Sequence, residues 1–111
     1  MSEPLIDLPT FSALQEAAGA EFVVELVDTF IEEAPVMLAE MRSAQSAGNA
    51  DAFRRAAHSL KSNSHTFGAT PLGELARELE QGGLIADSGP IDVLEAEYQR
   101  AAAALKKLCS G

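Results

Sequence analysis

Residues 56–69 read Ala-Ala-His-Ser-Leu-Lys-Ser-Asn-Ser-His-Thr-Phe-Gly-Ala, and their spacing predicts the second half of an amphipathic helix that begins near Asp51. At about 100° per residue, five side chains fall within roughly 80° of one another and form an apolar stripe: Phe53, Ala57, Leu60, Ser64 and Phe67. His58 lies roughly 140° from the middle of that stripe. The pattern therefore predicts an imidazole that a rigid helix presents to solvent.

An exposed imidazole with a neighbouring cation suits phosphoryl chemistry. His58 is a nucleophile near neutral pH, since the unperturbed pKa of histidine is about 6.5. Lys61 follows three residues later, and its ammonium group can pair with the charge of an incoming phosphoryl group. Ser62 sits almost opposite the core and faces solvent. These residues are candidates for a nucleophilic site.

His65 is the competing histidine. It follows His58 by seven residues, about 10.5 Å along a helix axis, which is too far for the two rings to hold one metal ion. No cluster of cysteine or aspartate supports a metal site either. We therefore expect no metal site, and we expect His65 to be a partly exposed groove residue near His58.

Composition limits the classes of protein to consider. A chain of 111 residues is one domain with a core that needs no metal or disulfide, and a single cysteine, Cys109, excludes an internal disulfide. Only five prolines and eight glycines interrupt the chain, which favours a few long helices, and no alternating β-branched run suggests a sheet. The fold class predicted is therefore all-α.

The charge balance argues against nucleic acid as a partner. The net charge is −9, from 17 acidic and 8 basic residues, so phosphate backbones and anionic lipids are repelled. No apolar run approaches the roughly 18 residues that span a membrane, and the first four residues do not resemble a signal peptide. We expect a cytoplasmic protein that binds neither membrane nor nucleic acid.

Helical periodicity and breaker residues divide the chain into one short and four long helices. The short helix is expected at residues 10–18, with Phe11 and Leu14 on one face. The long helices are expected at the following residues: 20–47, 51–67, 70–82, and from 90 to about 108. Short connections between them predict an antiparallel four-helix bundle, with the short N-terminal helix across one end.

Two of these boundaries depend on particular residues. Pro35 lies inside the first long helix, and we favour one bent helix over two helices that meet at Ala34, because the apolar stripe keeps its phase. That stripe is placed at Phe22, Leu26, Phe30, Met37 and Met41, and it is widened by Val23, Val27, Ile31 and Leu38. Either Asn49 or Asp51 can cap the next helix, and Thr70 is the expected cap of the one after it.

The central stretch resembles the signature of histidine-containing phosphotransfer (HPt) domains. His-Ser-Leu-Lys-Ser-Asn-Ser followed by Phe-Gly-Ala is similar to the family pattern His-x-Leu-Lys-Gly-Ser-(Ser/Ala)-x-x-(Leu/Phe)-Gly-Ala. The Phe-Ile-Glu-Glu-Ala-Pro stretch at residues 30–35 and residues 75–80 also resemble the family. The likeness covers about residues 6–108, and residues 1–111 are expected to form a single HPt-like domain.

The resemblance implies roles for particular residues. It makes His58 the phosphoacceptor and Lys61 the cation beside the phosphoryl group. Glu80 stands where the family often has a glutamine or an acid that hydrogen-bonds the other nitrogen of the histidine; the alternative is a solvated acid at the end of its helix. Ser62 replaces the glycine that the family commonly has there, and it is small enough to keep a supporting role.

No Gly-rich phosphate loop, paired magnesium acids or kinase motif is present, so the chain is not expected to be an enzyme that phosphorylates itself. The resemblance implies a phosphocarrier that relays phosphoryl groups between aspartates of receiver domains. It would need no cofactor of its own, because magnesium belongs to the acidic pocket of the receiver. The expected partners of this monomer are response-regulator receiver domains, with a hybrid sensor kinase as a further candidate.

An apolar patch near His58 is expected to dock the partner. Its candidate residues are Phe11 and Leu14 of the short helix, with His65 beside them. One of the first two residues is expected to cap the bundle and the other to meet the partner, and which one does which is left open. The rival hypothesis is a four-helix adaptor that binds a partner through an apolar face and does no phosphoryl chemistry. An exposed mid-helix histidine with a lysine three residues on favours phosphotransfer.

Overall fold

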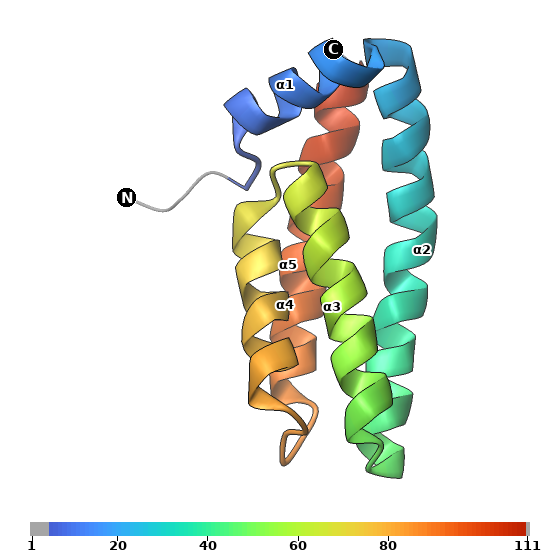
Figure 1. Ribbon diagram of the computed structural model, residues 1–111, viewed down its shortest axis with the longest axis vertical. Coiled ribbons are helices and arrows are strands. Elements are labelled where there is room, and N and C mark those ends of the chain that lie inside the picture. Colours follow the sequence, from blue (N-terminus) through green and yellow to red (C-terminus); the bar gives the residue numbers. More distant parts are fainter. Residues whose placement is uncertain (1–4, 111) are drawn as a thin grey trace.

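The computed structural model describes residues 5–110, which form five helices (Figure 1). The helices are α1 (Leu8–Ala18), α2 (Ala20–Ala47), α3 (Ala50–Thr66), α4 (Thr70–Gly82) and α5 (Gly89–Ser110). Residues 5–110 contain no strand, so the prediction of an all-α fold is confirmed. Over the same residues, none of the helices combines the length and apolar character needed to cross a bilayer.

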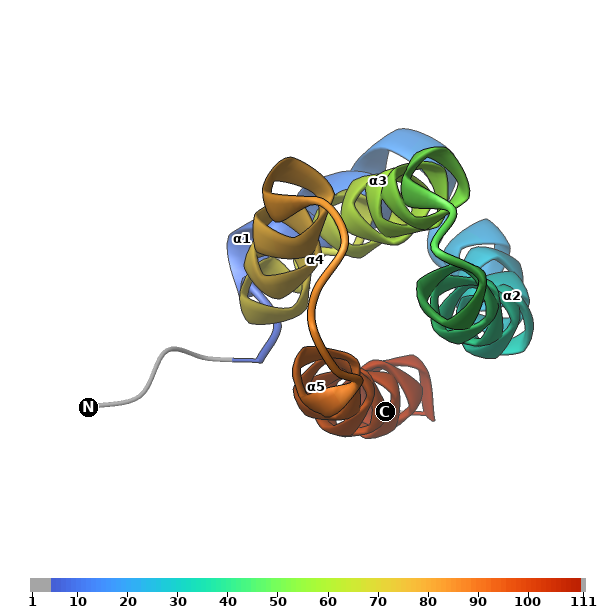
Figure 2. The same ribbon diagram turned by 90° about the horizontal axis from the view of Figure 1, so that it is seen from below.

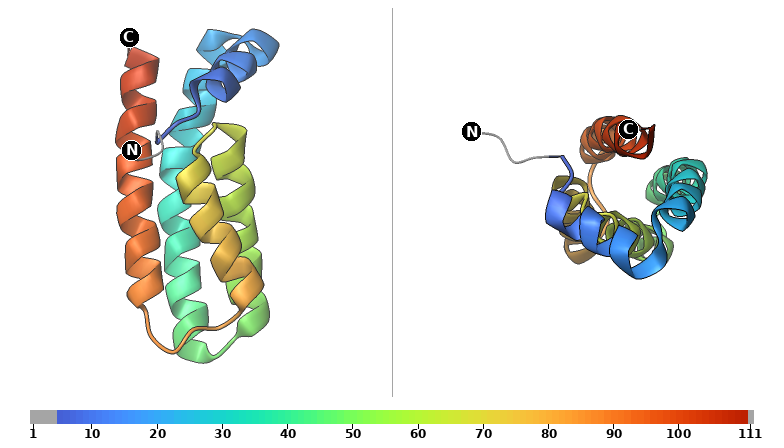
Figure 3. Two further views of the ribbon diagram at one scale, coloured as in Figure 1. Left: turned by 90° about the vertical axis from the view of Figure 1, so that its left-hand side faces the viewer. Right: turned by 90° about the horizontal axis from the view of Figure 1, so that it is seen from above.

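The four longer helices stand side by side, and consecutive ones run in opposite directions (Figure 1). Seen along the bundle, α3 lies between α2 and α4, and α5 packs against α2 and α4 (Figure 2). Helices α3 and α5 are diagonal to each other, and their backbones do not come into close contact within the described part of the chain. Helix α1 crosses one end of the bundle and contacts α2 and α3 (Figure 3). This leaves the outer face of α3 open along most of its length.

The stripe predicted for α3 is the one that is buried. Phe53, Ala57, Leu60, Ser64 and Phe67 all lie in the core. The buried hydroxyl of Ser64 donates to the carbonyl of Leu60 at 2.7 Å, so it needs no partner from another helix. His58 is thereby directed away from the core.

The wide stripe predicted for α2 faces the core except at its first residue, Phe22. Phe22 is half exposed, whereas its neighbour Val23 is fully buried. The buried face of α2 consists of Val23, Val27, Phe30, Ala34, Leu38, Met41 and Ala44. Two apolar series run along this helix, and the one that contains the small residues Ala34 and Ala44 is the buried one.

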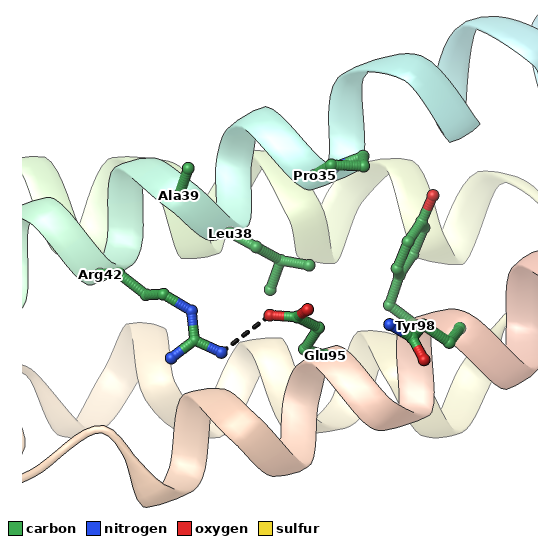
Figure 4. A pocket seen from close by; sticks show the side chains of 7 residues that line it. Pro35, Leu38, Ala39, Arg42, Glu95 and Tyr98 are labelled. Atoms are coloured by element: carbon green, nitrogen blue, oxygen red, sulfur yellow. Dashed lines mark hydrogen bonds and ion pairs between the residues drawn. The ribbon is translucent and has the colours of Figure 1, made fainter.

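Helix α2 continues without interruption across Pro35, as expected. Proline has no N–H, so the carbonyl of Ile31, four residues earlier, loses its normal helical partner. The hydroxyl of Tyr98 on α5 donates to that carbonyl at 3.1 Å. Figure 4 shows the Tyr98 ring reaching from α5 towards α2 beside Pro35. Burial raises the pKa of Tyr98, so the hydroxyl stays protonated and can donate.

The helix caps settle one open alternative and correct one prediction. Asn49 caps α3, because its side chain accepts a hydrogen bond from the N–H of Ala52 at 3.1 Å. Thr70 was expected to cap α4, but it is already the first helical residue, and its hydroxyl donates instead to the carbonyl of Gly68 at 3.4 Å. The proline that follows it occupies the first turn of α4.

Gly68 ties the segment before α1 to the end of α3. Its φ is +79°, which an L side chain adopts only with strain. A Cβ there would also lie 2.8 Å from the carbonyl oxygen of Asp7. The N–H of Asp7 donates to the carbonyl of Gly68 at 2.7 Å, and the Asp7 carboxylate caps α1. The position of α1 is therefore fixed relative to the helix that bears His58.

Candidate functional site

The site lies where α3 and α4 run side by side in opposite directions (Figures 1 and 2). The His58 side chain on α3 is 55% exposed, and its Nδ1 atom lies 2.6 Å from Oε2 of Glu80 on α4. Of the two alternatives left open for Glu80, the structure selects the contact with the histidine. The Glu80 side chain is only 15% exposed, so it is not a solvated acid.

Glu80 also binds Lys61. The Nζ atom of Lys61 lies 2.8 Å from Oε1 of Glu80, the second oxygen of the same carboxylate. The hydrogen bond from Lys61, and after it the one from His58, lowers the pKa of Glu80 below its ordinary value. The carboxylate is therefore ionised at neutral pH and is shared between an ammonium group and an imidazole.

The ionised Glu80 determines the tautomer of His58. A carboxylate can only accept a hydrogen bond, so the nitrogen that faces it, Nδ1, must carry the proton. The neutral ring then has its lone pair on Nε2, at the opposite side of the ring. The arrangement therefore presents an unprotonated, nucleophilic nitrogen on an exposed side chain.

The pairing of Lys61 with Glu80 is a feature that sequence reasoning missed. The sequence placed the ammonium group beside an incoming phosphoryl group, but the side chain is 23% exposed and turned into the groove between α3 and α4. The helical spacing did contain a signal. His58 and Lys61 lie three residues apart on the side of α3 that faces α4, so a single residue of α4 can contact both.

Ser62 stands outside this group of three residues. It is exposed, and its carbonyl accepts a hydrogen bond from the hydroxyl of Thr66 at 3.0 Å. No hydrogen bond joins its own hydroxyl to His58, Lys61 or Glu80, all of which the structure describes. A supporting role for Ser62 stays a prediction.

His65 has different surroundings on the same helix. Its side chain is 42% exposed, and Nε2 lies 3.8 Å from Oε2 of Glu74, too far for a hydrogen bond. The ring covers Gly73 so closely that a Cβ at Gly73 would lie 2.7 Å from Nε2. His65 is therefore a half-exposed groove residue, as the sequence predicted.

The docking patch stays a prediction, and the structure distinguishes the two residues of α1 that were proposed for it: Phe11 is the one that covers the bundle. Phe11 is only 3% exposed and belongs to the core, so it cannot meet a partner. Leu14 is half-buried. The exposed apolar residue of α1 is Leu8, which sequence reasoning missed because it placed the start of the helix at Thr10. The predicted start of the helix, two residues too late, left Leu8 outside the helix.

The donor set of the site suits protons and anions rather than a metal ion. The three residues in contact are one imidazole, one ammonium and one carboxylate. Within residues 5–110, no group of three or more His, Cys, Asp and Glu side chains could hold a metal ion.

Comparisons with known proteins agree with this geometry. The family model described as Hpt domain matches residues 25–104, which include His58, Lys61 and Glu80. The structure is similar to the crystal structure of histidine-containing phosphotransfer protein B (HptB) from Pseudomonas aeruginosa PAO1. That likeness has a TM-score of 0.83 and 29% sequence identity, and it covers 98% of this chain and 97% of that chain.

A search of curated protein sequences gives no significant match. The family model spans well over half of the chain and contains the whole group of three residues around the exposed imidazole. The chain therefore belongs to the Hpt domain family, whose members are phosphocarriers rather than kinases and serve phosphotransfer in two-component signalling.

Proposed function

We propose that the chain is a phosphorelay intermediate that accepts a phosphoryl group on Nε2 of His58 from a receiver-domain aspartate and passes it to another receiver aspartate. The observation that carries the proposal is the 2.6 Å contact between Nδ1 of His58 and Oε2 of Glu80. It holds the proton on one ring nitrogen and leaves the other free to attack.

In the accepting step, the lone pair of His58 Nε2 attacks the phosphorus atom of the aspartyl phosphate. The bond between phosphorus and the aspartate oxygen breaks, and the leaving carboxylate keeps the electron pair. The proton on Nδ1 stays in place, so the phosphorylated ring carries a positive charge. Glu80, directly opposite that proton, stabilises this charge. The reverse attack by a second aspartate returns the neutral ring.

Lys61 acts by exchanging partners. Before transfer it pairs with Glu80 at 2.8 Å. As the ring becomes positive, Glu80 gains a second cation, and Lys61 is then free to turn towards the phosphoryl oxygens. The Glu80 carboxylate therefore has a cationic partner at each stage, because the Lys61 ammonium leaves it as the positively charged ring forms.

The phosphoryl donor must come from outside the chain. The family consists of phosphocarriers, and the residues at this site supply a nucleophile, a positioning carboxylate and a cation. We propose receiver domains as the partners, with the magnesium ion supplied by the acidic pocket of the receiver. A hybrid sensor kinase is a further candidate partner.

The decisive experiment compares His58→Gln with His65→Gln, each mixed with a phosphorylated receiver domain and magnesium. A phosphohistidine is labile in acid and stable in base, so it can be told apart from phosphoserine at Ser62 or Ser64. We expect no acid-labile label on His58→Gln and nearly normal labelling of His65→Gln. Full labelling of His58→Gln would overturn the proposal.

A further inference from the structure

The helix that carries His58 has the opposite charge from the rest of the chain. The net charge of the chain is −9, with only eight lysines and arginines. Three of these eight lie on α3, namely Arg54, Arg55 and Lys61, against a single acid, Asp51. The outer face of this basic helix carries exposed residues, Arg54, Arg55 and His58 among them.

The two arginines lie on the same face of α3 as the imidazole. They precede His58 by four and three residues, which places them about one turn away, roughly 4.5 to 6 Å along the axis. Their side chains are 54% and 69% exposed. We call Arg54 and Arg55 the arginine pair.

Asp51 holds the arginine pair in place. Its carboxylate lies 2.8 Å from a guanidinium nitrogen of Arg54 and 3.1 Å from Nε of Arg55. The hydrogen bond from Arg54, and the charge of Arg55, lower the pKa of Asp51, so the carboxylate is ionised at neutral pH. One acid against two guanidinium groups leaves an excess positive charge beside the imidazole.

Within residues 5–110, no acid of a neighbouring helix forms an ion pair with either residue of the arginine pair. On α4, Glu80 binds His58 and Lys61, and Glu74 binds Arg77 at 3.0 Å. On α2, Glu40 lines a groove of about 270 Å³ that Arg55 also lines, but no ion pair joins the two within the described residues. The positive charge of the arginine pair therefore remains available to a partner.

We propose that the arginine pair docks the acidic rim of the receiver domain's phosphorylation pocket, an inference that rests on the proposed function. An aspartyl phosphate and the carboxylates that bind its magnesium ion are anionic, so a partner of this chemistry would be repelled by a chain of net charge −9. A local positive patch one turn from the nucleophile reverses that repulsion at the point of contact. It steers association and orients the pocket over His58.

The test measures receiver binding separately from transfer. In the His58→Gln background no phosphoryl group moves, so the Kd of a fluorescently labelled receiver domain, phosphorylated with acetyl phosphate in the presence of magnesium, can be read by anisotropy. Arg54→Glu is expected to weaken binding about tenfold at low ionic strength. The effect should shrink at high salt, because exposed charges are then screened.

Arg100 supplies a closely matched control. It is 56% exposed on α5 and pairs with Glu97 three residues earlier at 2.7 Å, just as Arg54 pairs with Asp51 at 2.8 Å. Helix α5 is diagonal to α3, and Arg100→Glu makes the same change in net charge. We expect less than a twofold change in Kd for this control.

Asp51→Asn tests the opposite sign. It removes the acid that neutralises part of the arginine pair, so binding should become tighter, with circular dichroism used to check that α3 remains helical. Equal Kd values for Arg54→Glu and Arg100→Glu would overturn the inference, because net charge alone would then explain them. Self-association of the wild type that Arg54→Glu abolishes would also overturn it, and would assign the pair to a contact between copies of the chain. Failure of the proposed function has a different readout, the absence of acid-labile label on the wild type.

Discussion

Two histidines seven residues apart on α3 share a helix, a direction and partial exposure, but they meet different residues of α4. His58 faces Glu80 at 2.6 Å, whereas His65 covers Gly73 and lies 3.8 Å from Glu74. Exposure alone does not distinguish the rings, at 55% and 42% of their side chains. The residue on the facing helix makes one imidazole a nucleophile with a fixed tautomer and leaves the other as a groove residue.

The residue three positions further along α3 strengthens the contrast. After His58 this residue is Lys61, and after His65 it is Gly68, already beyond the end of the helix. The carbonyl groups of the last turn carry partial negative charge, which would oppose a phosphoryl group on His65. A phosphoryl group on His58 sits in the middle of α3, away from that end.

Among the variants that test the difference between His58 and His65, Lys61→Ala is expected to have the largest effect, which is on the rate of phosphoryl transfer. Loss of one charge-assisted contact to the phosphoryl group should slow transfer by about 1.5 to 3 kcal/mol, or roughly tenfold to a hundredfold. The measurement is the rate of acid-labile labelling from a phosphorylated receiver. Lys106→Ala, which changes an exposed lysine of α5, is the control. A wild-type rate for Lys61→Ala would contradict the proposed contact between Lys61 and the phosphoryl group.

Glu80→Gln should have the next largest effect. Glutamine still accepts a hydrogen bond from Nδ1 of His58, but it cannot offset the positive charge of the phosphorylated ring. The difference between a charged and a neutral hydrogen bond is about 1 kcal/mol, so labelling should slow about fivefold. The matched control is Glu74→Gln beside His65, for which we expect an unchanged rate. Equal slowing by both variants would mean that the two histidines do not differ as described.

Gly73→Ala tests the close contact between the His65 ring and Gly73 by its effect on the free energy of unfolding. Alanine normally stabilises a helix interior over glycine by about 1 kcal/mol, but here the new Cβ would meet the His65 ring. Because that ring is half exposed and can turn away, we expect little net change in the wild-type background. In the His65→Ala background the full gain of about 1 kcal/mol should appear in urea unfolding. A full gain in both backgrounds would contradict the close contact.

The smallest effect concerns the pH dependence of the free energy of unfolding. The pKa of Glu80 is lowered in the folded protein, so its carboxylate stabilises the fold above its unfolded pKa of about 4.3. That contribution is lost as pH falls through the lowered pKa. The difference in unfolding free energy between wild type and Glu80→Gln should therefore shrink as the pH falls below about 4. A difference that does not change with pH would contradict the ion pairs of Glu80.

The sequence predicted the features that depend on one helix at a time. The stripe of α3, the exposure of His58 and the continuity of α2 across Pro35 follow from residue spacing within a single helix. The sequence did not predict features that depend on how two helices meet. The pairing of Lys61 with Glu80 requires the register of α3 against α4, and only the resemblance to a family suggested Glu80 at all.

The wrong prediction for Phe22 and the alternative left open between Phe11 and Leu14 have the same cause. Phe11 and Phe22 are both large and apolar, but one lies in the core and the other is half exposed. Which side of each helix turns inward depends on how α1 crosses the bundle and on which of two apolar series in α2 faces its neighbours. Side-chain type does not contain that information.

The hydrogen bond that Tyr98 donates to the carbonyl left unpaired by Pro35 constrains the order in which these two positions can change during evolution. Loss of the tyrosine hydroxyl while proline is present would leave a carbonyl without its partner, at a cost of about 1 to 3 kcal/mol. Once position 35 carries an N–H, the carbonyl has its own helical partner and the hydroxyl becomes dispensable. A lineage can therefore replace Pro35 first and Tyr98 afterwards with little loss, whereas the reverse order passes through a destabilised intermediate.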